Sequence, residues 1–224
     1  MRVGIAGYGV VGKTRHRSIV ANTSYQVTAI SESSEDARKS IPADSIVFND
    51  YKSLIANAEI DIIFISLPNQ FAAEATSLSL KKGLHVFCEK PPARTYHELL
   101  AVQNEALKFP ELKLMYGFNH RFHLSVEEAK SIIQGNSLGQ IINMKGVYGK
   151  SQMISFNQTD WRTNREASGG GILLDQGIHM LDLMRYLSGE NFTQVFSFID
   201  NAFWNFDVED NAYVLMKSPA GIVA

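Results

Sequence analysis

A short apolar run at the start of the chain, Arg2–Ala6, leads directly into a glycine-rich turn and then into a helical segment. The turn, Gly7–Gly12, reads G-Y-G-V-V-G. In a strand–turn–helix unit of this kind one glycine makes the tight turn, one lets the backbone approach a pyrophosphate, and one lets the helix pack closely on the strand. The helix N-terminus then offers unpaired N–H groups to phosphates. The pattern predicts a dinucleotide-binding unit, and a βα turn that binds no ligand is the alternative.

A second expected strand, Gln26–Ile30, leads to Glu32, which lies close to the ~20-residue offset from the first glycine at which an acidic residue meets the adenosine ribose. A carboxylate there accepts hydrogen bonds from the ribose hydroxyls and repels a 2′-phosphate, which favours NAD over NADP. Ser33 and Arg38 are close enough in sequence to hold a phosphate, so NADP stays open. The alternative for Glu32 is one charge in a solvated run.

Strands and helices continue to alternate up to residue 117. Ile60–Leu67 is an almost uninterrupted apolar run, as expected for a parallel strand covered on both faces. Pro68-Asn69 and Glu89-Lys90 follow strands, at the carboxyl edge where such sheets bind ligands. The alternation predicts an α/β fold with a doubly wound parallel sheet. Further strands are expected at Val47-Phe48, Leu84–Cys88 and Lys113–Tyr116, and helices at Tyr51–Ala58, Phe71–Lys82 and Thr95–Phe109.

The apolar pattern changes past residue 117, which predicts a Rossmann domain over residues 1–117 and a second domain over residues 118–224. The strands expected in the second domain alternate apolar and polar residues, as is typical of an antiparallel sheet with one exposed face. We expect an α+β domain with an open, mainly antiparallel sheet that binds substrate and mediates oligomerisation. Its strands are expected at Ile141–Tyr148, Gln194–Asp200 and Asn211–Met216, and a helix at Leu124–Gln134.

The stretch Ser168–Gly189 combines three consecutive glycines with an apolar helical pattern that ends at a glycine stop signal. Asp175 and His179 are four residues apart, so on a helix they share one face. One interpretation is a core histidine hydrogen-bonded to an aspartate, and the other is a general acid–base histidine with an orienting carboxylate. The residues that predict a buried apolar stripe are Leu173, Leu174, Ile178, Leu181 and Leu187.

Composition excludes several classes of partner. The formal net charge of −2 gives no electrostatic argument for nucleic acid or for an anionic membrane surface. No apolar run approaches the ~20 residues that a membrane span needs. The single cysteine, Cys88, fits a reducing compartment, and the cytoplasm is expected. His120 and His123 are read as packing in an aromatic loop, so no metal site is expected.

Three signals stand in order along the chain: the glycine motif Gly7–Gly12, Glu89-Lys90-Pro91 after a strand, and the G-G-G-x-x-x-D-x-G-x-H-x-x-D string of Gly169–Asp182. Together they resemble the glucose–fructose oxidoreductase / inositol dehydrogenase / MocA family of nicotinamide-dependent oxidoreductases. Gly117–Phe122 and Asp160–Arg162 also match family positions. The resemblance covers the whole chain, but family members are usually longer, so the C-terminal part of the pattern is expected to be missing.

The resemblance implies a dehydrogenase or reductase acting on a CHOH or C=O group of a sugar, cyclitol or sugar nucleotide. Lys90 would hydrogen-bond the reacting hydroxyl, His179 would take its proton, and Asp175 would hold the site together. His120, Arg121, Trp161 and Arg162 would join these three residues in contacting substrate. NAD or NADP would be bound by Gly7, Gly9, Val10, Val11, Gly12, Glu32, Pro68, Asn69, Glu89 and Lys90.

Two alternatives to an active enzyme remain: a non-catalytic dinucleotide-binding sensor, and an inactive fragment of a longer enzyme. The intact set of Lys90, Asp175 and His179 argues against a sensor, because a sensor has no need of a proton-transfer residue. Ala72 stands where many family members carry a histidine, which puts the sugar contacts of that loop in doubt. By resemblance, the open sheet of the second domain implies a homodimer or homotetramer.

Overall fold

The computed structural model describes residues 1–22, 24–149 and 161–224. The chain divides into two compact units, Met1–Gly117 and Phe118–Ala224, which differ in architecture. In the part of the chain that the structure describes, no helix is long and apolar enough to cross a bilayer.

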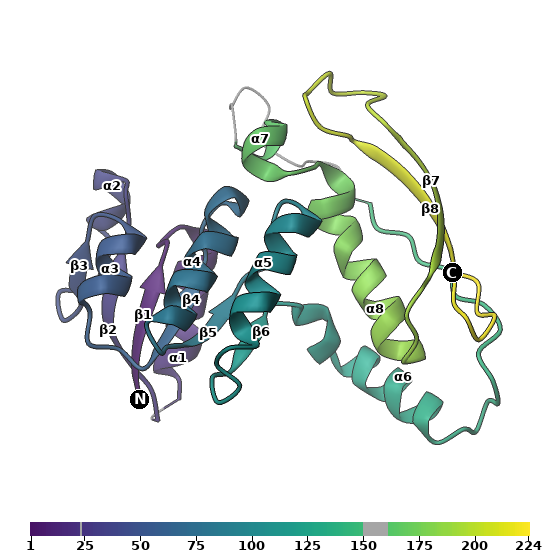
Figure 1. Cartoon of the computed structure of the whole chain (residues 1–224), viewed down its shortest axis with the longest axis horizontal. Helices are drawn as coiled ribbons and strands as arrows, with labels where there is room; N and C mark the ends of the chain where they lie inside the picture. The colour runs from purple at the N-terminus through teal and green to yellow at the C-terminus, as the bar shows by residue number, and fades with distance from the viewer. Residues whose placement is uncertain (23, 150–160) are drawn as a thin grey trace. The chain divides into compact units, whose positions relative to one another are not determined.

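The first unit is built on a six-stranded parallel sheet with the order β3-β2-β1-β4-β5-β6 (Figure 1). Because β1 and β4 are neighbours, the strand order reverses between them, and ligands of such sheets bind at that switch point. The predicted doubly wound parallel sheet is therefore confirmed. The strands are β1 (Arg2–Ala6), β2 (Gln26–Ser31), β3 (Ile46–Phe48), β4 (Ile62–Ile65), β5 (His85–Cys88) and β6 (Leu114–Tyr116).

The helices of this unit begin at residues with clear local causes. In α3 the Asp50 carboxylate accepts the N–H of Ser53 at 2.8 Å, and in α5 the Thr95 hydroxyl accepts the N–H of Glu98 at 3.2 Å. The helix after β4 begins at Asn69, two residues before the predicted start, because Pro68 serves as its N-cap residue. The helices are α1 (Val10–Val20), α2 (Glu35–Arg38), α3 (Tyr51–Asn57), α4 (Asn69–Lys81) and α5 (Tyr96–Ala106).

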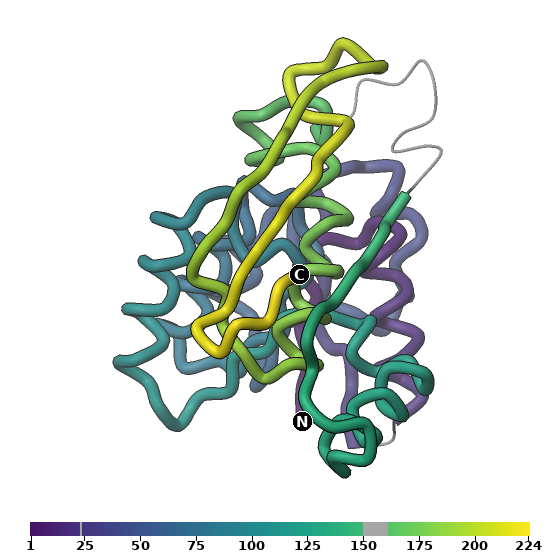
Figure 2. The backbone as a smooth tube through the Cα atoms, turned by 90° about the vertical axis from the view of Figure 1, so that its right-hand side faces the viewer, coloured from purple at the N-terminus to yellow at the C-terminus, as the bar shows by residue number. Residues whose placement is uncertain are grey.

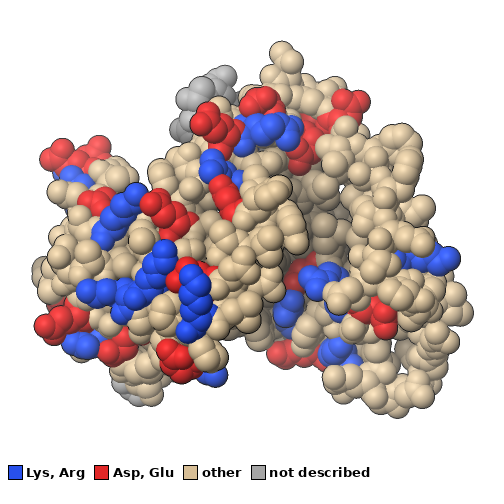
Figure 3. Space-filling model, in the orientation of Figure 1, with Lys and Arg blue, Asp and Glu red and all other residues tan. Residues whose placement is uncertain are grey.

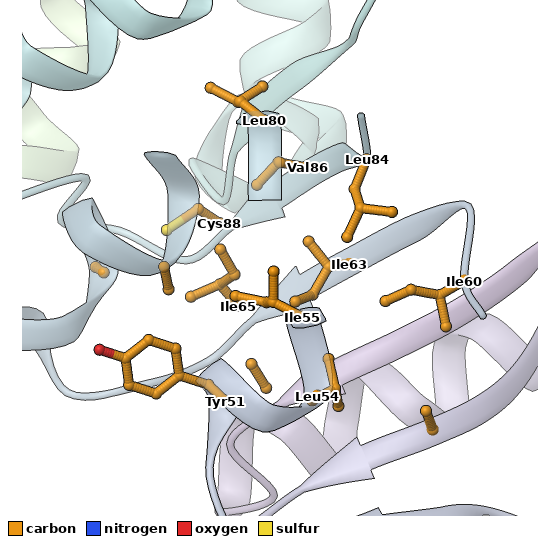
Figure 4. Packing of buried hydrophobic residues seen from close by; sticks show 14 residues of the cluster. Tyr51, Leu54, Ile55, Ile60, Ile63, Ile65, Leu80, Leu84, Val86 and Cys88 are labelled. Carbon is orange, nitrogen blue, oxygen red and sulfur yellow. The ribbon is translucent and has the colours of Figure 1, made fainter. Parts of the chain in front are cut away.

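The core of the first unit lies on both faces of the central strands. Ile63 and Ile65 of β4 are buried in one cluster with residues of α3 and α4 (Figure 4), while Ile62 and Phe64 pack on the cluster of the opposite face. This two-sided burial explains the continuous apolar run that predicts β4. Burying each such isoleucine contributes about 1.5–3 kcal/mol, so the sheet is a rigid platform for the loops at its carboxyl edge.

The second unit combines helices with a two-stranded antiparallel sheet, so the predicted α+β organisation is confirmed. The strand prediction for residues 141–148 is wrong: Asn143 makes an isolated bridge to Val223, and Ile142 and Val147 are exposed. An alternating apolar pattern is local, but a segment forms a β-strand only if a neighbouring strand is present to hydrogen-bond with it. The elements are η1 (Asn119–Phe122), α6 (Leu124–Gln134), η2 (Trp161–Thr163), α7 (Arg165–Ser168), the π-helical η3 (Leu173–Gly177), α8 (Ile178–Ser188), β7 (Gln194–Asp200) and β8 (Asn211–Lys217).

Strands β7 and β8 form a long twisted ribbon, with the last residues of the chain beside β8 (Figure 2). Met216 and Ala224 exchange backbone hydrogen bonds of 2.8 and 2.9 Å. The register places Phe196 opposite Leu215 and Phe198 opposite Tyr213 on one face of the ribbon. On the view of Figure 3 this ribbon is mostly tan, whereas basic and acidic side chains intermix over the first unit.

Candidate active site

The glycine motif of the first unit has three glycines with different surroundings. Gly7 has a φ of +88°, and a Cβ there would lie 2.5 Å from the carbonyl oxygen of Ser66. A Cβ on Gly12 would lie 2.0 Å from the carbonyl oxygen of Gly7, so this glycine lets α1 pack on the turn. Gly9 differs, because nothing lies within 4 Å of its Cβ position. The fold therefore requires glycine at positions 7 and 12. It does not require glycine at position 9, where the space next to the backbone is open.

That open space adjoins the N-terminus of α1. Its N-cap residue is Gly9, with no capping side chain, and no acidic residue lies in its first turn. Val10 and Val11, the first two residues of α1, are 85% and 43% exposed. A helix N-terminus with its backbone approachable at a glycine suits a phosphate group. The residues present thus fit the pyrophosphate of a dinucleotide.

Glu32 lies at the end of β2 and is joined to the glycine turn. Its Oε2 accepts the backbone N–H of Tyr8 at 2.8 Å, and its Oε1 accepts that of Ser34 at 2.9 Å. Arg38 donates to the carbonyl oxygens of Glu32 and Ser33 at 2.9 and 3.0 Å, which fixes the backbone of this loop. A carboxylate has about four acceptor positions, so two remain for further donors such as ribose hydroxyls.

The residues after β5 carry a second group of predicted site residues. Arg15 Nε donates to Glu89 Oε1 at 2.5 Å, and the Arg15 guanidinium lies over the ring of Phe87, 4.9 Å from its centroid. A Cβ on Gly117 would lie 2.6 Å from Glu89 Oε2, so this glycine makes room for the carboxylate. The Glu89 side chain is thereby held in place, directly before Lys90.

Lys90 itself is half-buried and precedes a cis peptide bond to Pro91. At the end of β4, Pro68 and Asn69 form the start of α4, and Asn69 is 7% exposed. The structure therefore places the polar residues that follow β4 and β5 at the carboxyl edge of neighbouring strands. This is the edge that the alternation of strands and helices predicts as the ligand-binding edge.

In the second unit, the triple glycine packs against Glu209. The N–H of Gly171 donates to Glu209 Oε1 at 2.7 Å, and the N–H of Ile172 donates to the Glu209 carbonyl oxygen at 2.9 Å. A Cβ on Gly171 would lie 1.9 Å from that carbonyl oxygen. The glycine is therefore needed for the close approach of two backbones, and this contact fixes where the helix that carries His179 begins.

The expected regular helix over this stretch differs from the structure at its start, since Leu173–Gly177 form a π-helical turn before α8. Such turns occur frequently at functional sites. Asp175 lies in the π-helical turn and accepts a hydrogen bond of 2.7 Å from Gln176 Nε2. Asp175 and His179 therefore flank the junction between η3 and α8.

The predicted buried apolar stripe is also wrong. The buried side chains of η3 and α8 are the polar residues Gln176, His179 and Asp182, and His179 is 5% exposed. The leucines of the predicted stripe are half-buried. Leu173 and Leu181, with Met180 and Met184, line a hollow of about 810 Å³ between α8 and β8. The polar face is thus the better packed face of this helix.

His179 packs against three aromatic rings from two other segments of its unit. The imidazole of His120 stacks on it with centroids 4.0 Å apart and an interplanar angle of 12°. The ring of Tyr148 lies 6.2 Å from His179 and 5.7 Å from His120, and Phe118 presents its edge at 6.4 Å. The structure therefore brings His120 and His179 together, although the sequence separates them widely.

Arg121 makes a two-pronged ion pair with Asp182. Its Nε donates to Asp182 Oδ2 at 2.8 Å, and an Nη donates to Oδ1. The guanidinium lies over the rings of Phe118 and Tyr186, at 5.6 and 5.1 Å. The neighbouring carboxylate raises the pKa of Arg121 above its ordinary value. The pair joins η1 to α8, and therefore fixes the residue next to His120 relative to the helix of His179.

Two further predicted residues lie in η2, where the Arg162 guanidinium is 4.3 Å from the ring centroid of Trp161. Asp160, which also matches the family pattern, lies outside the described residues. Cys88 is buried, and burial raises the pKa of its thiol to about 12, which fits a packing role. Among the described residues, no group of three His, Cys, Asp or Glu side chains is placed to hold a metal ion.

Sequence reasoning missed Arg15, Tyr148, Asp182 and Glu209 as residues that support these sites. Arg15 and Glu209 act on Glu89 and Gly171 from distant parts of the sequence, and no periodic pattern marks either. Asp182 did carry a signal, because it ends the G-G-G-x-x-x-D-x-G-x-H-x-x-D string. Its spacing of three residues from His179 places both on the buried face of one helix.

Comparison with known proteins gives matches over both units. Residues 1–118 match the model of an oxidoreductase family with an NAD-binding Rossmann fold, and residues 126–224 match that of the GFO/IDH/MocA C-terminal domain. D-glucoside 3-dehydrogenase of Escherichia coli (strain K12) is 30% identical over 195 residues, which cover 84% of this chain and 54% of that protein. The chain thus spans about half the length of the curated relatives it matches.

Solved structures give the same result. The crystal structure of myo-inositol 2-dehydrogenase from Lactobacillus plantarum is 27% identical with a TM-score of 0.88, covering 100% of this chain and 68% of that one. Levoglucosan dehydrogenase in complex with NADH and levoglucosan is 26% identical with a TM-score of 0.90, covering 100% and 65%. The chain therefore belongs to the GFO/IDH/MocA family of oxidoreductases, as its motifs predict.

Proposed function

We propose that the protein is an NAD-dependent dehydrogenase that oxidises a CHOH group of a sugar or cyclitol, or reduces the corresponding carbonyl. The observation that carries the proposal is the buried imidazole of His179, which lies two residues after the π-helical turn that holds Asp175. The names of its relatives support the substrate class, since they include a D-glucoside 3-dehydrogenase and a myo-inositol 2-dehydrogenase.

The residues of the glycine turn would hold the cofactor. Gly9 leaves the backbone open to a pyrophosphate, and the exposed Val10 and Val11 begin the helix that would face it. Glu32 would accept the ribose hydroxyls and disfavour NADP, and Pro68, Asn69 and Glu89 would line the cofactor at the strand ends. When bound, the nicotinamide supplies the hydride acceptor, and the protein supplies orientation and proton transfer.

The remaining roles fall to three side chains. Lys90 would hydrogen-bond the reacting hydroxyl and stabilise negative charge that develops on its oxygen. His179 would take the hydroxyl proton as the carbonyl forms, since an imidazole can accept and return a proton near neutral pH. Asp175, one turn earlier, would orient the imidazole or the substrate.

His120, Trp161 and Arg162 remain candidates for substrate contact. For Arg121 we propose a positioning role instead, because Nε and an Nη of its guanidinium already bind Asp182. A sugar nucleotide is a further possible substrate, and it belongs in the same assay panel.

We also propose that two copies associate through the outer face of the β7–β8 ribbon. Phe196, Phe198, Tyr213 and Leu215 share that face by their register, and they are between 57% and 71% exposed. A contiguous apolar face of this kind typically marks an interaction surface. Because the single cysteine is a buried free thiol, we place the protein in the reducing cytoplasm.

The test is a pair of measurements on the purified protein and on His179→Ala. A panel of sugars, inositols and sugar nucleotides is screened for substrate-dependent formation of NADH, and NAD binding is measured separately. We expect turnover to fall by about two to four orders of magnitude in the variant, as is usual when acid–base catalysis is lost, while NAD binding changes little.

His97→Ala serves as the control, because His97 is exposed and lies on α5 of the first unit. Equal turnover in His179→Ala and the parent would contradict the assigned role. NAD binding without turnover on any member of the panel would favour the non-catalytic sensor.

A further inference from the structure

The stack of His120 on His179 has a chemical consequence beyond packing. Both rings can carry a proton near neutral pH. At a centroid distance of 4.0 Å and an angle of 12°, two imidazolium ions would lie face to face. Like charges at this separation disfavour double protonation, whereas a single imidazolium over a neutral imidazole is favourable. The stacked geometry therefore favours one proton on the pair over two, which couples the protonation of the two rings.

Burial decides which ring takes that proton. His179 is 5% exposed, whereas His120 lies on η1 and is only half-buried. Removing a charge from water is costly, so the better solvated ring is protonated first. The resulting charge on His120 then opposes protonation of His179.

Other titratable and charged groups lie on the elements of the second unit that carry or contact the stack. His123 follows η1, with its ring 5.1 Å from that of His120, and Tyr148 stacks against both imidazoles. Asp175 precedes His179 by four residues, and its carboxylate would favour a charged ring. Arg121 and Asp182 are paired with each other, which largely cancels their charges. His120 is the titratable ring in closest contact with His179 among these groups.

We propose that His120 tunes the proton affinity of His179, taking the first proton itself and keeping His179 in the neutral, proton-accepting form to lower pH than its surroundings would otherwise allow. This inference rests on the proposed function for its catalytic meaning, but the coupling is a property of the two rings alone. It makes His120 a residue that acts through His179, in addition to any contact it makes with substrate.

The test follows the imidazole titration of His179 by NMR in the parent protein and in His120→Phe. Phenylalanine keeps a planar ring for the stack and removes the titrating charge. We expect the midpoint of His179 to move up by about one pH unit or more, the scale of strongly interacting sites. His120→Gln should move it in the same direction, and His179→Asn identifies the resonance. His123→Phe is the matched control, because its ring contacts His120, and it should leave the midpoint within a few tenths of a unit.

An unchanged His179 midpoint in both His120 variants would overturn the proposal, as would an equal shift in His123→Phe. With a substrate in hand, the acid limb of log(kcat/KM) should move to higher pH by the same interval in His120→Phe. If the NMR shift occurs but no panel member is turned over, the coupling stands and the proposed dehydrogenase activity fails. If turnover depends on His179 but the His179 midpoint does not move in the His120 variants, the dehydrogenase activity stands and the coupling fails.

Discussion

The carboxylate of Glu32 has a structural role and an electrostatic one. Its two oxygens accept the N–H groups of Tyr8 and Ser34, and by its charge it would discriminate against a 2′-phosphate. A glutamine amide has one acceptor oxygen, so it can keep one of these two hydrogen bonds while it removes the charge. Variants at this one residue can therefore separate the shape of the turn from the choice of cofactor.

For Glu32→Gln we expect the preference for NAD over NADP to narrow by about tenfold or more, equivalent to ~1.4 kcal/mol, with a smaller loss of stability than in Glu32→Ala. Glu32→Ala should narrow the preference similarly but also lose about 1–2 kcal/mol of stability, because the N–H groups of Tyr8 and Ser34 then lose their acceptors. Dissociation constants for both cofactors and urea unfolding measure the two effects. Equal affinities for NAD and NADP in the parent protein would show that Glu32 does not meet the ribose.

The ion pair of Arg121 and Asp182 is asymmetric in burial. Asp182 has a side chain that is 7% exposed, whereas that of Arg121 is 38% exposed. Removing the arginine leaves a buried carboxylate without its counter-ion, while removing the carboxylate leaves a cation that water can reach. The two halves of one pair should therefore differ in the cost of their loss.

We expect Arg121→Met to lower the free energy of unfolding by about 2–4 kcal/mol, and Asp182→Asn by about 1 kcal/mol less. The fluorescence of the two tryptophans, Trp161 and Trp204, reports on the second unit, which contains both. Arg185→Met is the control, because this arginine is an exposed residue of the same helix. A larger loss for Asp182→Asn than for Arg121→Met would contradict this account.

At the scale of elements, the turn between β1 and α1 separates what the fold needs from what a ligand needs. A Cβ at Gly12 would clash with the backbone of Gly7, but a Cβ at Gly9 meets nothing within 4 Å. Gly9 has a φ of −70°, which alanine adopts without strain. The element itself therefore gives no reason for a glycine at this position, and a bound pyrophosphate does.

Gly9→Ala is expected to change stability by less than about 1 kcal/mol, the scale of an N-cap substitution. Its affinity for NAD should fall by about tenfold or more, since the methyl group would occupy the space of the phosphates. Gly12→Ala is the matched contrast, with an expected loss of about 1–3 kcal/mol of stability from overpacking. Thermal unfolding followed by circular dichroism and a titration with NAD distinguish them. If Gly9→Ala bound NAD as tightly as the parent, the pyrophosphate would not bind at this turn.

At the scale of the whole molecule, the β7–β8 ribbon leaves large apolar side chains exposed on its outer face. Phe196 and Phe198 contact each other edge to face at 5.0 Å, and their cross-strand neighbours are Leu215 and Tyr213. Such a face is costly to leave in water. In a dimer with a two-fold axis the same apolar face of each copy would meet, so that both faces are removed from water.

We therefore expect the protein to sediment as a dimer or larger species at micromolar concentration, and Phe198→Glu to shift it toward monomer. Tyr96→Glu is the matched control, because Tyr96 is 71% exposed on α5 and Phe198 is 69% exposed on β7. A stable monomer of the parent protein, or equal effects of the two variants, would exclude association through this face.

Sequence alone determined the features that depend on local chemistry. The predictable elements were the glycine turn, the apolar strands of the first unit and the helix over Leu124–Gln134. Each depends on a local property, a positive φ, burial or helical periodicity, that restricts which residue types can occur. The motifs around Lys90 and His179 likewise identified the family. These predictions needed no knowledge of how one element packs on another.

Tertiary structure alone decided the features that depend on partners distant in sequence. The run over residues 141–148 has strand character but makes only an isolated bridge, since no described strand lies along it. The helix of His179 buries its polar face, because that face meets η1 and Tyr148. Likewise, His120 stacks on His179 while its neighbour Arg121 binds Asp182. The sequence of this segment does not show that these two adjacent side chains have different partners. The type of a residue indicates whether its side chain tends to be buried or exposed, but the tertiary fold determines which other side chain it contacts.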